Sequence, residues 1–441
     1  MSRNLTSRFV PTLNLANKAC LEEISGEAEL STIMLVNCLV FFAILFFSGL
    51  NCKPQTLLLI SLDGFRWDFA GKAHTPYLEF LKKTGVTVPY VRSVFPTVTM
   101  PGHYSIVTGL YPESHGIISN TMYDPVLKAR FGAAQTDPRW WNGAEPIWVT
   151  NQKQKGKSGV LYWPGYNIKI KGMYPKYREY SPSPNVDQFN KTGKVMGFEK
   201  RAKKVIDWLT AKNPPNFVAV YFEEPDKTCH HAGWRDLPEA IQRVDKTVGL
   251  FVEGLKQHEL LDKVNIMITA DHGMANTSCN KVIDLDKYVD PENYDFWDSW
   301  FNMLLAPKAG KMEDVYKRLK NVCHLHVYHK NEVPEYLHFR SSPRISPLVV
   351  FPSEGWVLSS KKGRRVPMPK NGQWKKLSHG FSCKCKSMST AFIARGPAFK
   401  ENFEGKPFGS VSLYPLMCKI LGIQPLPNNG SLDATADLLA P

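Results

Sequence analysis

Residues 56–64 read Thr-Leu-Leu-Leu-Ile-Ser-Leu-Asp-Gly, a nearly continuous apolar run that ends at Asp63 and Gly64. Such runs are typical of strands that are buried on both faces, as in a parallel sheet. Two later stretches have the same form. They are Phe217–Phe222, followed by Glu-Glu-Pro-Asp226, and Val264–Ala270, followed by Asp-His-Gly273. The three runs therefore predict three strands of a parallel sheet, each with an acid directly after it.

Helical patterns lie between these runs. Thr75-Pro76 has the form of a helix start, with threonine as N-cap and proline in the first turn. Gly197–Thr210 and Leu237–Gln257 place apolar residues on one helical face. This alternation predicts an α/β fold, with a mostly parallel central sheet and helices on both faces. Residues 294–366 show no clear period and contain several prolines, so we expect a small irregular lobe there.

The length and composition bound the class of protein. The chain has 441 residues, of which 43% are hydrophobic and 22% charged, so it can bury a sizeable core. Its net charge of +15 favours anionic partners such as phosphate esters, glycans, lipid headgroups or nucleic acid. The sequence contains no nucleic-acid-binding motif, so we do not expect a nucleic-acid-binding module.

The N-terminal region contains an uncharged apolar run, Ile33–Leu50, of 18 residues. A run of this length serves as a signal-peptide core or spans a membrane marginally. We therefore divide the chain into a targeting segment, 1–50, and a body, 51–441. A cleaved signal is preferred over a membrane anchor, and translation could start at Met1 or Met34. Either way the body faces the cell exterior, as a secreted or cell-surface domain.

Sequons and cysteines agree with an extracellular body. Three sequons predict glycosylation, at Asn190, Asn276 and Asn429. Six of the nine cysteines lie in the body, which suggests a few disulfides. No Cys-x-x-Cys pair occurs, so a zinc–thiolate site is not expected.

A second informative stretch is Phe95-Pro-Thr-Val-Thr-Met-Pro-Gly-His103, after which residues 103–110 have the pattern of the first turns of a helix. Thr99 therefore sits where a loop becomes a helix. Backbone N–H groups at a helix N-terminus are unpaired, and the helix dipole favours negative charge there. A hydroxyl held at such a point is well placed to meet a phosphate, although a plain Pro-Thr turn is the alternative interpretation.

The acids after the three strands are expected to converge, because ligands bind beyond the carboxyl ends of strands in open α/β sheets. His230 follows Asp226 by four residues, a spacing that lets both side chains meet one metal. Oxygen and imidazole ligands without thiolate suit two Zn²⁺ ions. The candidate ligands are Asp63, Asp226, His230, Asp271, His272 and His379, with the hydroxyl of Thr99.

Several motifs together resemble the ectonucleotide pyrophosphatase/phosphodiesterase family of the alkaline phosphatase superfamily. They are Ser61-Leu-Asp-Gly-Phe65, Phe95-Pro-Thr-x-Thr-x-Pro, His103–Gly116, Glu223-Glu-Pro-Asp-x-x-x-His230, Asp271-His-Gly-Met274 and Pro427-Asn-Asn-Gly430. The resemblance extends from about residue 55 to the C-terminus. The chain looks most like the short members, which lack somatomedin-like and nuclease-like domains.

The resemblance implies a role for each matching residue. Thr99 would be the nucleophile. One zinc ion would be held by Asp226, His230 and His379, and the other by Asp63, Thr99, Asp271 and His272. Asn120 would bind a phosphate oxygen, and Met100, Trp163 and Tyr180 would line the pocket for the base. Cys279 and Cys323 would form a disulfide.

The family's activity then implies hydrolysis of nucleotides or dinucleotides by a monomeric extracellular enzyme, with release of a nucleoside 5'-monophosphate. Three positions depart from the family pattern. Gly102 replaces the usual asparagine, Met100 replaces a common aromatic residue, and residues 381–385 replace an aromatic-Asp-Asn run. Two alternatives therefore stay open: a choline-lipid phosphodiesterase, and a surface interaction protein with weak activity.

Overall fold

The computed structural model describes residues 55–132, 135–179, 196–299, 303–366 and 375–441. Residues 54–441 form one compact unit. The targeting segment 1–50, Tyr180 and Asn190 lie outside the described residues, so those predictions stay predictions. Within the described part of the chain, no helix combines the length and apolar character that crossing a membrane requires.

The centre of the fold is a seven-stranded sheet with the order β18-β2-β17-β8-β1-β7-β6. Strand β1 (Thr56–Leu62) pairs in parallel with both β7 (Phe217–Phe222) and β8 (Val264–Thr269). The remaining strands are β6 (Ser158–Leu161), β2 (Val86–Thr87), β17 (Ile393–Arg395) and β18 (Phe403–Glu404). Only β17 runs antiparallel to its neighbours. The mostly parallel sheet predicted from the three apolar runs is therefore confirmed.

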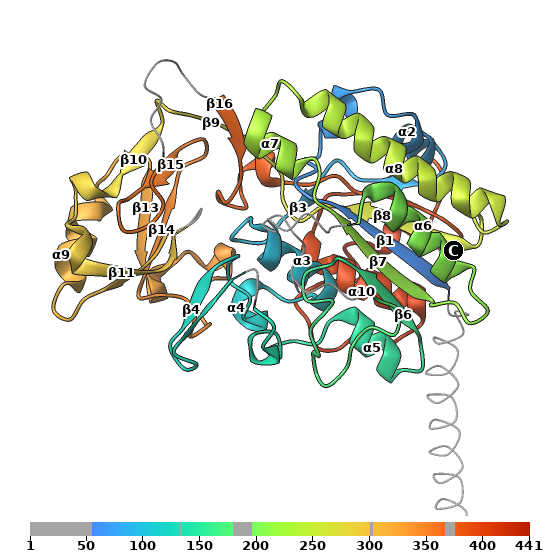
Figure 1. The fold of residues 1–441 in the computed structure, drawn as a ribbon, viewed down its shortest axis with the longest axis horizontal. Helices are drawn as coiled ribbons and strands as arrows, with labels where there is room; N and C mark the ends of the chain where they lie inside the picture. Colours follow the sequence, from blue (N-terminus) through green and yellow to red (C-terminus); the bar gives the residue numbers. More distant parts are fainter. Residues whose placement is uncertain (1–54, 133–134, 180–195, 300–302, 367–374) are drawn as a thin grey trace, which may run out of the picture. The chain divides into compact units, whose positions relative to one another are not determined.

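Helices cover both faces of this sheet (Figure 1). One layer contains α2 (Pro76–Lys83), α6 (Phe198–Leu209) and α8 (Leu237–Gln257), in which α2 and α6 both contact α8. The other contains α3 (Thr99–Thr108), α5 (Ile147–Lys153) and α10 (Leu413–Leu421), and α10 contacts β1. Helix α8 turns Val244, Val248 and Phe251 inward, and all three are fully buried. The two-layer cover follows from amphipathic helices that each bury one stripe.

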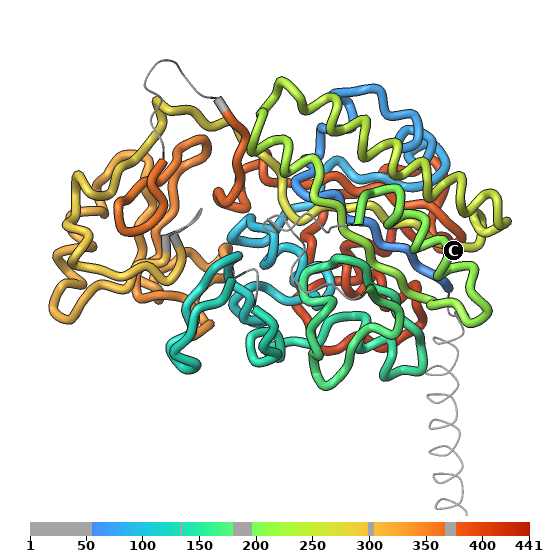
Figure 2. The backbone as a smooth tube through the Cα atoms, in the orientation of Figure 1, coloured from blue at the N-terminus to red at the C-terminus, as the bar shows by residue number. Residues whose placement is uncertain are grey.

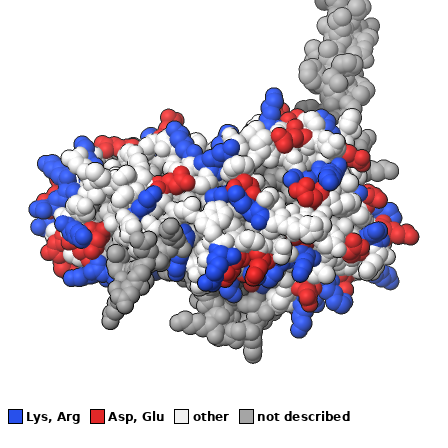
Figure 3. All heavy atoms as spheres, turned by 90° about the horizontal axis from the view of Figure 1, so that it is seen from above, with Lys and Arg blue, Asp and Glu red and all other residues white. Residues whose placement is uncertain are grey.

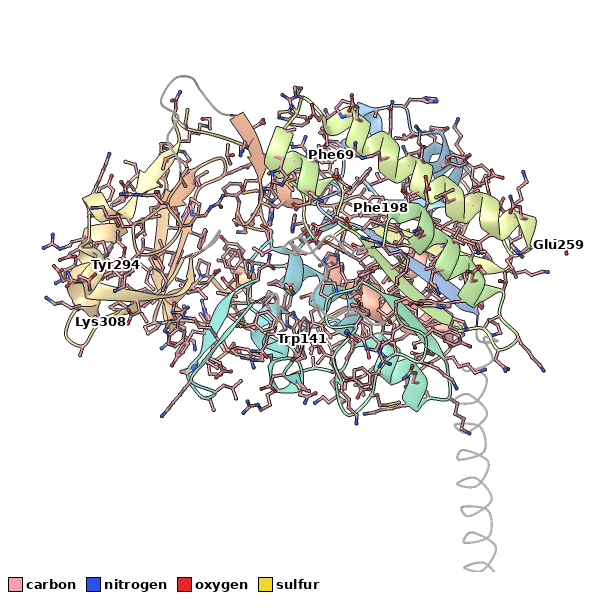
Figure 4. The ribbon with its side chains drawn as sticks, viewed as in Figure 1. Phe69, Trp141, Phe198, Glu259, Tyr294 and Lys308 are labelled. Carbon is pink, nitrogen blue, oxygen red and sulfur yellow. The ribbon has the colours of Figure 1, made fainter. Side chains whose placement is uncertain are left out.

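The lobe is more regular than the sequence indicated. Strands β11 (Tyr294–Ser299), β12 (Met303–Pro307), β14 (Leu348–Pro352) and β13 (Leu325–His329) form an antiparallel sheet in that order, and α9 (Met312–Lys320) contacts β13. The yellow-to-orange tube in Figure 2 shows that one continuous stretch of chain builds it. Its core includes the fully buried Tyr294, labelled in Figure 4. The expectation of an irregular lobe is wrong, because the prolines Pro307 and Pro352 end strands instead of preventing them.

Short elements complete the fold. The two-stranded pairs are β10 (Val282–Asp284) with β15 (Val357–Ser359), β9 (Ala275–Ser278) with β16 (Lys375–Ser378), β3 (Val91–Arg92) with β19 (Phe408–Gly409), and β4 (Met122–Asp124) with β5 (Ala129–Phe131). Two short helices, α4 (Pro112–His115) and α7 (Asp226–Ala232), lie between larger elements. Helix α7 matters most here, because it carries two of the predicted metal ligands.

The predicted disulfide between Cys279 and Cys323 is not formed, and the six cysteines of the described residues are all free. Cys279 is buried, with its Sγ 3.6 Å from Asn280 Oδ1, whereas Cys323 is exposed just beyond α9. We correct that prediction accordingly.

The net positive charge is not gathered on the face seen in Figure 3, where basic and acidic side chains are interspersed.

The buried imidazole of His115, at the end of α4, makes the fold sensitive to acid. Its Nδ1 accepts the N–H of Ile117 at 3.1 Å and its Nε2 lies 2.9 Å from Ser105 Oγ, so the ring is held neutral. Burial lowers the pKa of His115 from 6.5 to about 3. As the pH falls below 6.5, His115 binds a proton in the unfolded chain but stays neutral in the folded chain. Stability is therefore lost progressively between pH 6.5 and about 3.

We expect His115 alone to cost about 2 kcal/mol of folding free energy on going from pH 7 to pH 5. The variant His115→Asn keeps an acceptor for the Ile117 N–H, and its unfolding free energy should fall by that much less over the same interval. Urea titrations at both pH values measure the difference. Exposed His258→Asn serves as control; equal acid losses in His115→Asn and the unmodified chain would contradict the assignment.

Candidate metal centre and nucleophile

Two overlapping groups of side chains could hold a metal ion. One contains Asp226, His230 and His379, and the other contains Asp63, Asp226 and His272. Within each group the ligand atoms all lie within 4.8 Å of one another. Five of the predicted ligands, which are far apart in the sequence, therefore meet beyond the carboxyl ends of β1, β7 and β8.

The first group is built on α7. Asp226 and His230 are one helical turn apart, which places His230 Nε2 3.2 Å from Asp226 Oδ1. His379, just after β16, brings its Nε2 to 3.1 Å from His230 Nε2 and 3.6 Å from Asp226 Oδ1. Its Nδ1 lies 2.8 Å from the backbone oxygen of Thr97. A carbonyl that accepts the Nδ1 proton leaves the Nε2 lone pair directed at the group, as in histidines that bind metals.

The second group is built on the ends of β1 and β8. His272 Nε2 lies 3.6 Å from Asp63 Oδ1 and 3.0 Å from Asp271 Oδ2. Its Nδ1 is 3.1 Å from the backbone oxygen of Gly273, so this ring too presents Nε2 to the group. The rings of His272 and His379 stack with centroids 3.6 Å apart. The two groups are therefore contiguous, and Asp271 joins the second one.

The electrostatics of these side chains fit a bound cation. Burial, followed by the carboxylates of Asp271 and Asp226, raises the pKa of Asp63 well above its usual value. Burial, followed by repulsion between this ring and that of His272, lowers the pKa of His379. Carboxylates that repel one another and an imidazole kept neutral by burial are donors of the kind that a metal ion needs.

Asp271 provides the clearest sign that the residues fit a metal. Its Oδ1 accepts the N–H of Gly64 at 3.1 Å. Its Oδ2 is buried and receives no hydrogen bond from any described residue, although it faces the Nε2 of His272. A buried carboxylate oxygen that receives no hydrogen bond is costly, unless a cation lies beside it.

Thr99 lies beside this cluster at the start of α3. The helix begins at Thr99, four residues earlier than predicted, so Thr99 is its first residue and Val98 its N-cap. Thr99 Oγ1 is 3.4 Å from His272 Nε2. The side-chain Oδ1 of Asn120 accepts the Met100 N–H at 2.8 Å, so the side-chain amide nitrogen of Asn120 is the end left to donate. A hydroxyl, a donor and a helix N-terminus thus meet next to the metal ligands.

Gly102 explains how α3 comes so close to β8. A Cβ on Gly102 would lie 2.9 Å from both the Cβ and the backbone oxygen of Asp271, closer than such atoms pack. The family that the motifs resemble usually carries an asparagine at this position. An asparagine side chain does not fit at this spacing. The glycine therefore allows the first turn of α3 to rest against the backbone that carries Asp271.

We expect Gly102→Ala to push α3 away from Asp271 and to displace Thr99 from the cluster. Overpacking of this kind costs about 1–3 kcal/mol in stability. A displacement of about 1 Å at a reacting group can cost about a hundredfold in rate. Urea unfolding and kcat/KM measure the two effects. Gly71→Ala is the control, because a Cβ at Gly71 meets nothing within 4 Å; unchanged kcat/KM in Gly102→Ala would refute this account.

Two supporting residues were not expected from the sequence. Tyr221, on β7, donates its hydroxyl to Asp63 Oδ2 at 2.5 Å. His103, on α3, lies 2.8 Å from the backbone oxygen of Thr99 through Nδ1 and 2.8 Å from Ser61 Oγ through Nε2. Both side chains are fully buried, so they fix the orientation of Asp63 and of the start of α3. The available signals were the phenol of Tyr221 inside the apolar run Phe217–Phe222 and the position of His103 four residues after Thr99.

The other predicted site residues are placed as follows. Met100 is 6% exposed, and Trp163 is fully buried, with its indole N–H donated to the backbone oxygen of His103. Trp163 therefore packs beneath α3 and offers no exposed face, and its role toward a base stays a prediction.

The predicted glycosylation sites Asn276 and Asn429 are exposed, as glycosylation requires. Asn276 Oδ1 accepts the indole N–H of Trp234, and Asn429 Oδ1 accepts the backbone N–H of Tyr111.

Comparison with known proteins places this fold and site in a class. The family described as Type I phosphodiesterase / nucleotide pyrophosphatase matches residues 57–382, and the chain belongs to this family. It is 38% identical over 398 residues to ectonucleotide pyrophosphatase/phosphodiesterase family member 5 of Homo sapiens, covering 89% of this chain and 79% of that protein. It is 40% identical over 397 residues to bis(5'-adenosyl)-triphosphatase enpp4 of Mus musculus, covering 88% and 82%.

Solved structures agree. An inactive variant of murine ectonucleotide pyrophosphatase/phosphodiesterase 5 in complex with AMP superposes with a TM-score of 0.80, at 37% sequence identity, over 88% of this chain and all of that one. The human counterpart superposes with the same TM-score at 36% identity, over 87% of this chain. The alkaline-phosphatase-like α/β fold expected from the motifs is thereby confirmed.

Proposed function

We propose that this protein is a zinc-dependent extracellular phosphodiesterase that hydrolyses nucleotides or dinucleotides and releases a nucleoside 5'-monophosphate. The observation that carries the proposal is the position of Thr99 Oγ1 at a helix N-terminus, 3.4 Å from His272 in the ligand cluster. Two relatives support a nucleotide substrate. The related murine member 5 was solved in complex with AMP, and the mouse relative enpp4 is named a bis(5'-adenosyl)-triphosphatase.

The residues would divide the reaction between them. Asp226, His230 and His379 would hold one zinc ion, and Asp63, Asp271 and His272 with Thr99 would hold the other. Two zinc ions bound there would favour the ionised hydroxyl and offset charge on the phosphate. Thr99 Oγ attacks phosphorus, and the bond to the leaving group breaks with its electron pair. Water then hydrolyses the threonyl ester.

Asn120 and the start of α3 bear on the transition state. The amide nitrogen of Asn120 donates to an oxygen of the phosphate, and its orientation is fixed by the Met100 N–H. The N-terminus of α3 adds the favourable end of its dipole. Tyr221 holds Asp63 in place through Oδ2. These groups are set before the substrate arrives, which is what electrostatic preorganisation requires.

The experiment is turnover of the purified full-length protein with zinc. We expect cleavage of p-nitrophenyl thymidine monophosphate and of diadenosine polyphosphates, with much slower cleavage of p-nitrophenyl phosphorylcholine. The reverse preference would identify the choline-lipid phosphodiesterase instead. No zinc-dependent cleavage of either class would leave the surface interaction protein as the function and would overturn the enzyme proposal.

A further inference from the structure

A cavity lies apart from the metal ligands. It has a volume of about 570 Å³, and its lining includes Tyr90, residues 92–95, part of residues 383–389, residues 407–412 and Tyr336 of the lobe. None of the seven predicted metal-binding residues lines it. Thr97 lies between the two sites in sequence: the wall ends at Phe95, and Thr97 contacts His379. The cavity is therefore distinct from the catalytic cluster, and its volume falls in the range of small-molecule sites.

The charged side chains that line this cavity are all basic. Arg92, Lys384 and Lys386 line it and are exposed, and no aspartate or glutamate is among the lining residues. None of the three basic side chains forms an ion pair with a carboxylate of the described part of the chain. Elsewhere basic side chains are commonly paired, as Arg395 is with Asp262. Three unpaired cations around one hollow attract an anion.

The hydroxyl of Ser410 is an independent sign of a ligand. Ser410 is 3% exposed and lines the cavity, and its Oγ has no hydrogen-bond partner among the described residues. A buried hydroxyl without a partner costs free energy. Ser410 also begins the turn that leads into α10, so the favourable end of that helix dipole faces the same side. An acceptor oxygen of a ligand would satisfy the hydroxyl.

Aromatic side chains form much of the remaining wall. Tyr90, Tyr111 and Tyr336 line the cavity, and Lys384 Nζ lies 3.6 Å from the centroid of the Tyr336 ring. Phe95 adds a buried apolar surface. We propose that this cavity binds a small organic anion, in which a phosphate or sulfate head is joined to an aromatic or other apolar body. The head meets Arg92, Lys384 and Ser410, and the body lies against the tyrosines.

The test uses the full-length zinc-loaded protein and the fluorescent probe anilinonaphthalene sulfonate, an aromatic anion. We expect saturable binding at one site. Arg92→Gln and Lys384→Gln should each weaken it about tenfold, the usual loss for a charge-assisted hydrogen bond. Gly409→Leu should abolish it by filling the cavity, since a Cβ there meets only Val411, at 3.9 Å. The control is Lys419→Gln, an exposed lysine of α10 outside the lining.

Competition identifies the source of the ligand. If phenyl phosphate displaces the probe at concentrations where inorganic phosphate does not, the cavity binds a soluble phosphate ester. If monomeric lysophosphatidate displaces the probe, the cavity binds a lipid. Each result supports the proposal. Equal probe affinity in the two charge variants and in Lys419→Gln would overturn it, as would failure of both competitors to displace the probe. Turnover in the charge variants should equal that of the unmodified protein.

Discussion

Replacement of Thr99 by alanine should reduce kcat by at least about a thousandfold while leaving nucleotide affinity within a few fold. Thr99 supplies the only proposed nucleophile, and its Oγ1 faces His272 from the first residue of α3. Alanine removes the attacking oxygen but keeps the helix start, the Asn120 amide and the buried carboxylate and imidazole ligands. The variant should therefore still bind nucleotides, although it no longer cleaves them.

The measurements are single-turnover cleavage of a p-nitrophenyl nucleotide ester and calorimetric titration with AMP. Thr108→Ala is a matched control, because it removes a threonine hydroxyl at the opposite end of α3, where Oγ1 donates to the backbone oxygen of Tyr104. Thr99→Ser should restore part of the rate, since it returns a hydroxyl. Comparable rates in Thr99→Ala and the unmodified protein would exclude Thr99 as the nucleophile.

The sequence predicted the parts of the site that depend on local pattern and topology. Three buried apolar runs were sufficient to place β1, β7 and β8 and to bring Asp63, Asp226 and Asp271 to one edge of the sheet. The spacing of Asp226 and His230 was sufficient to place both on one face of α7. These inferences succeed because a strand end and a helical turn have fixed geometry.

Other features depend on packing that no short window encodes. The lobe was expected to be irregular, because residues 294–366 show no clear period and contain several prolines. Its strands nevertheless pair with partners up to about fifty residues away, as Leu304 does with Val349. The contact of Tyr221 with Asp63 joins residues on different strands. The burial of Trp163 beneath His103 likewise follows from how α3 packs, which the residues around Trp163 do not encode.

Replacement of Asp226 by asparagine should have the second large effect, on both metal content and activity. Asp226 belongs to both candidate ligand groups, and its Oδ1 lies 3.2 Å from His230 and 3.6 Å from His379. Burial acts to raise the pKa of Asp226, but its interactions with the neighbouring imidazoles, first that of His230, outweigh burial and hold this pKa well below its usual value. The carboxylate is therefore ionised and able to bind a cation, whereas the asparagine amide is neutral.

We expect zinc content to fall from two ions per chain toward one, and kcat/KM to fall at least about a thousandfold, because one side of the bimetallic clamp is lost. Zinc binding stabilises the folded state by about 2.7 kcal/mol at a free concentration of a hundred times Kd, so the zinc-dependent rise in Tm should shrink as well. Elemental analysis and thermal unfolding with and without chelator measure these effects. His231→Ala is the matched control, since His231 follows His230 on α7 but is exposed and outside both groups. Full zinc content in Asp226→Asn, or an equal loss in His231→Ala, would show that the ion is not held where α7 meets β16.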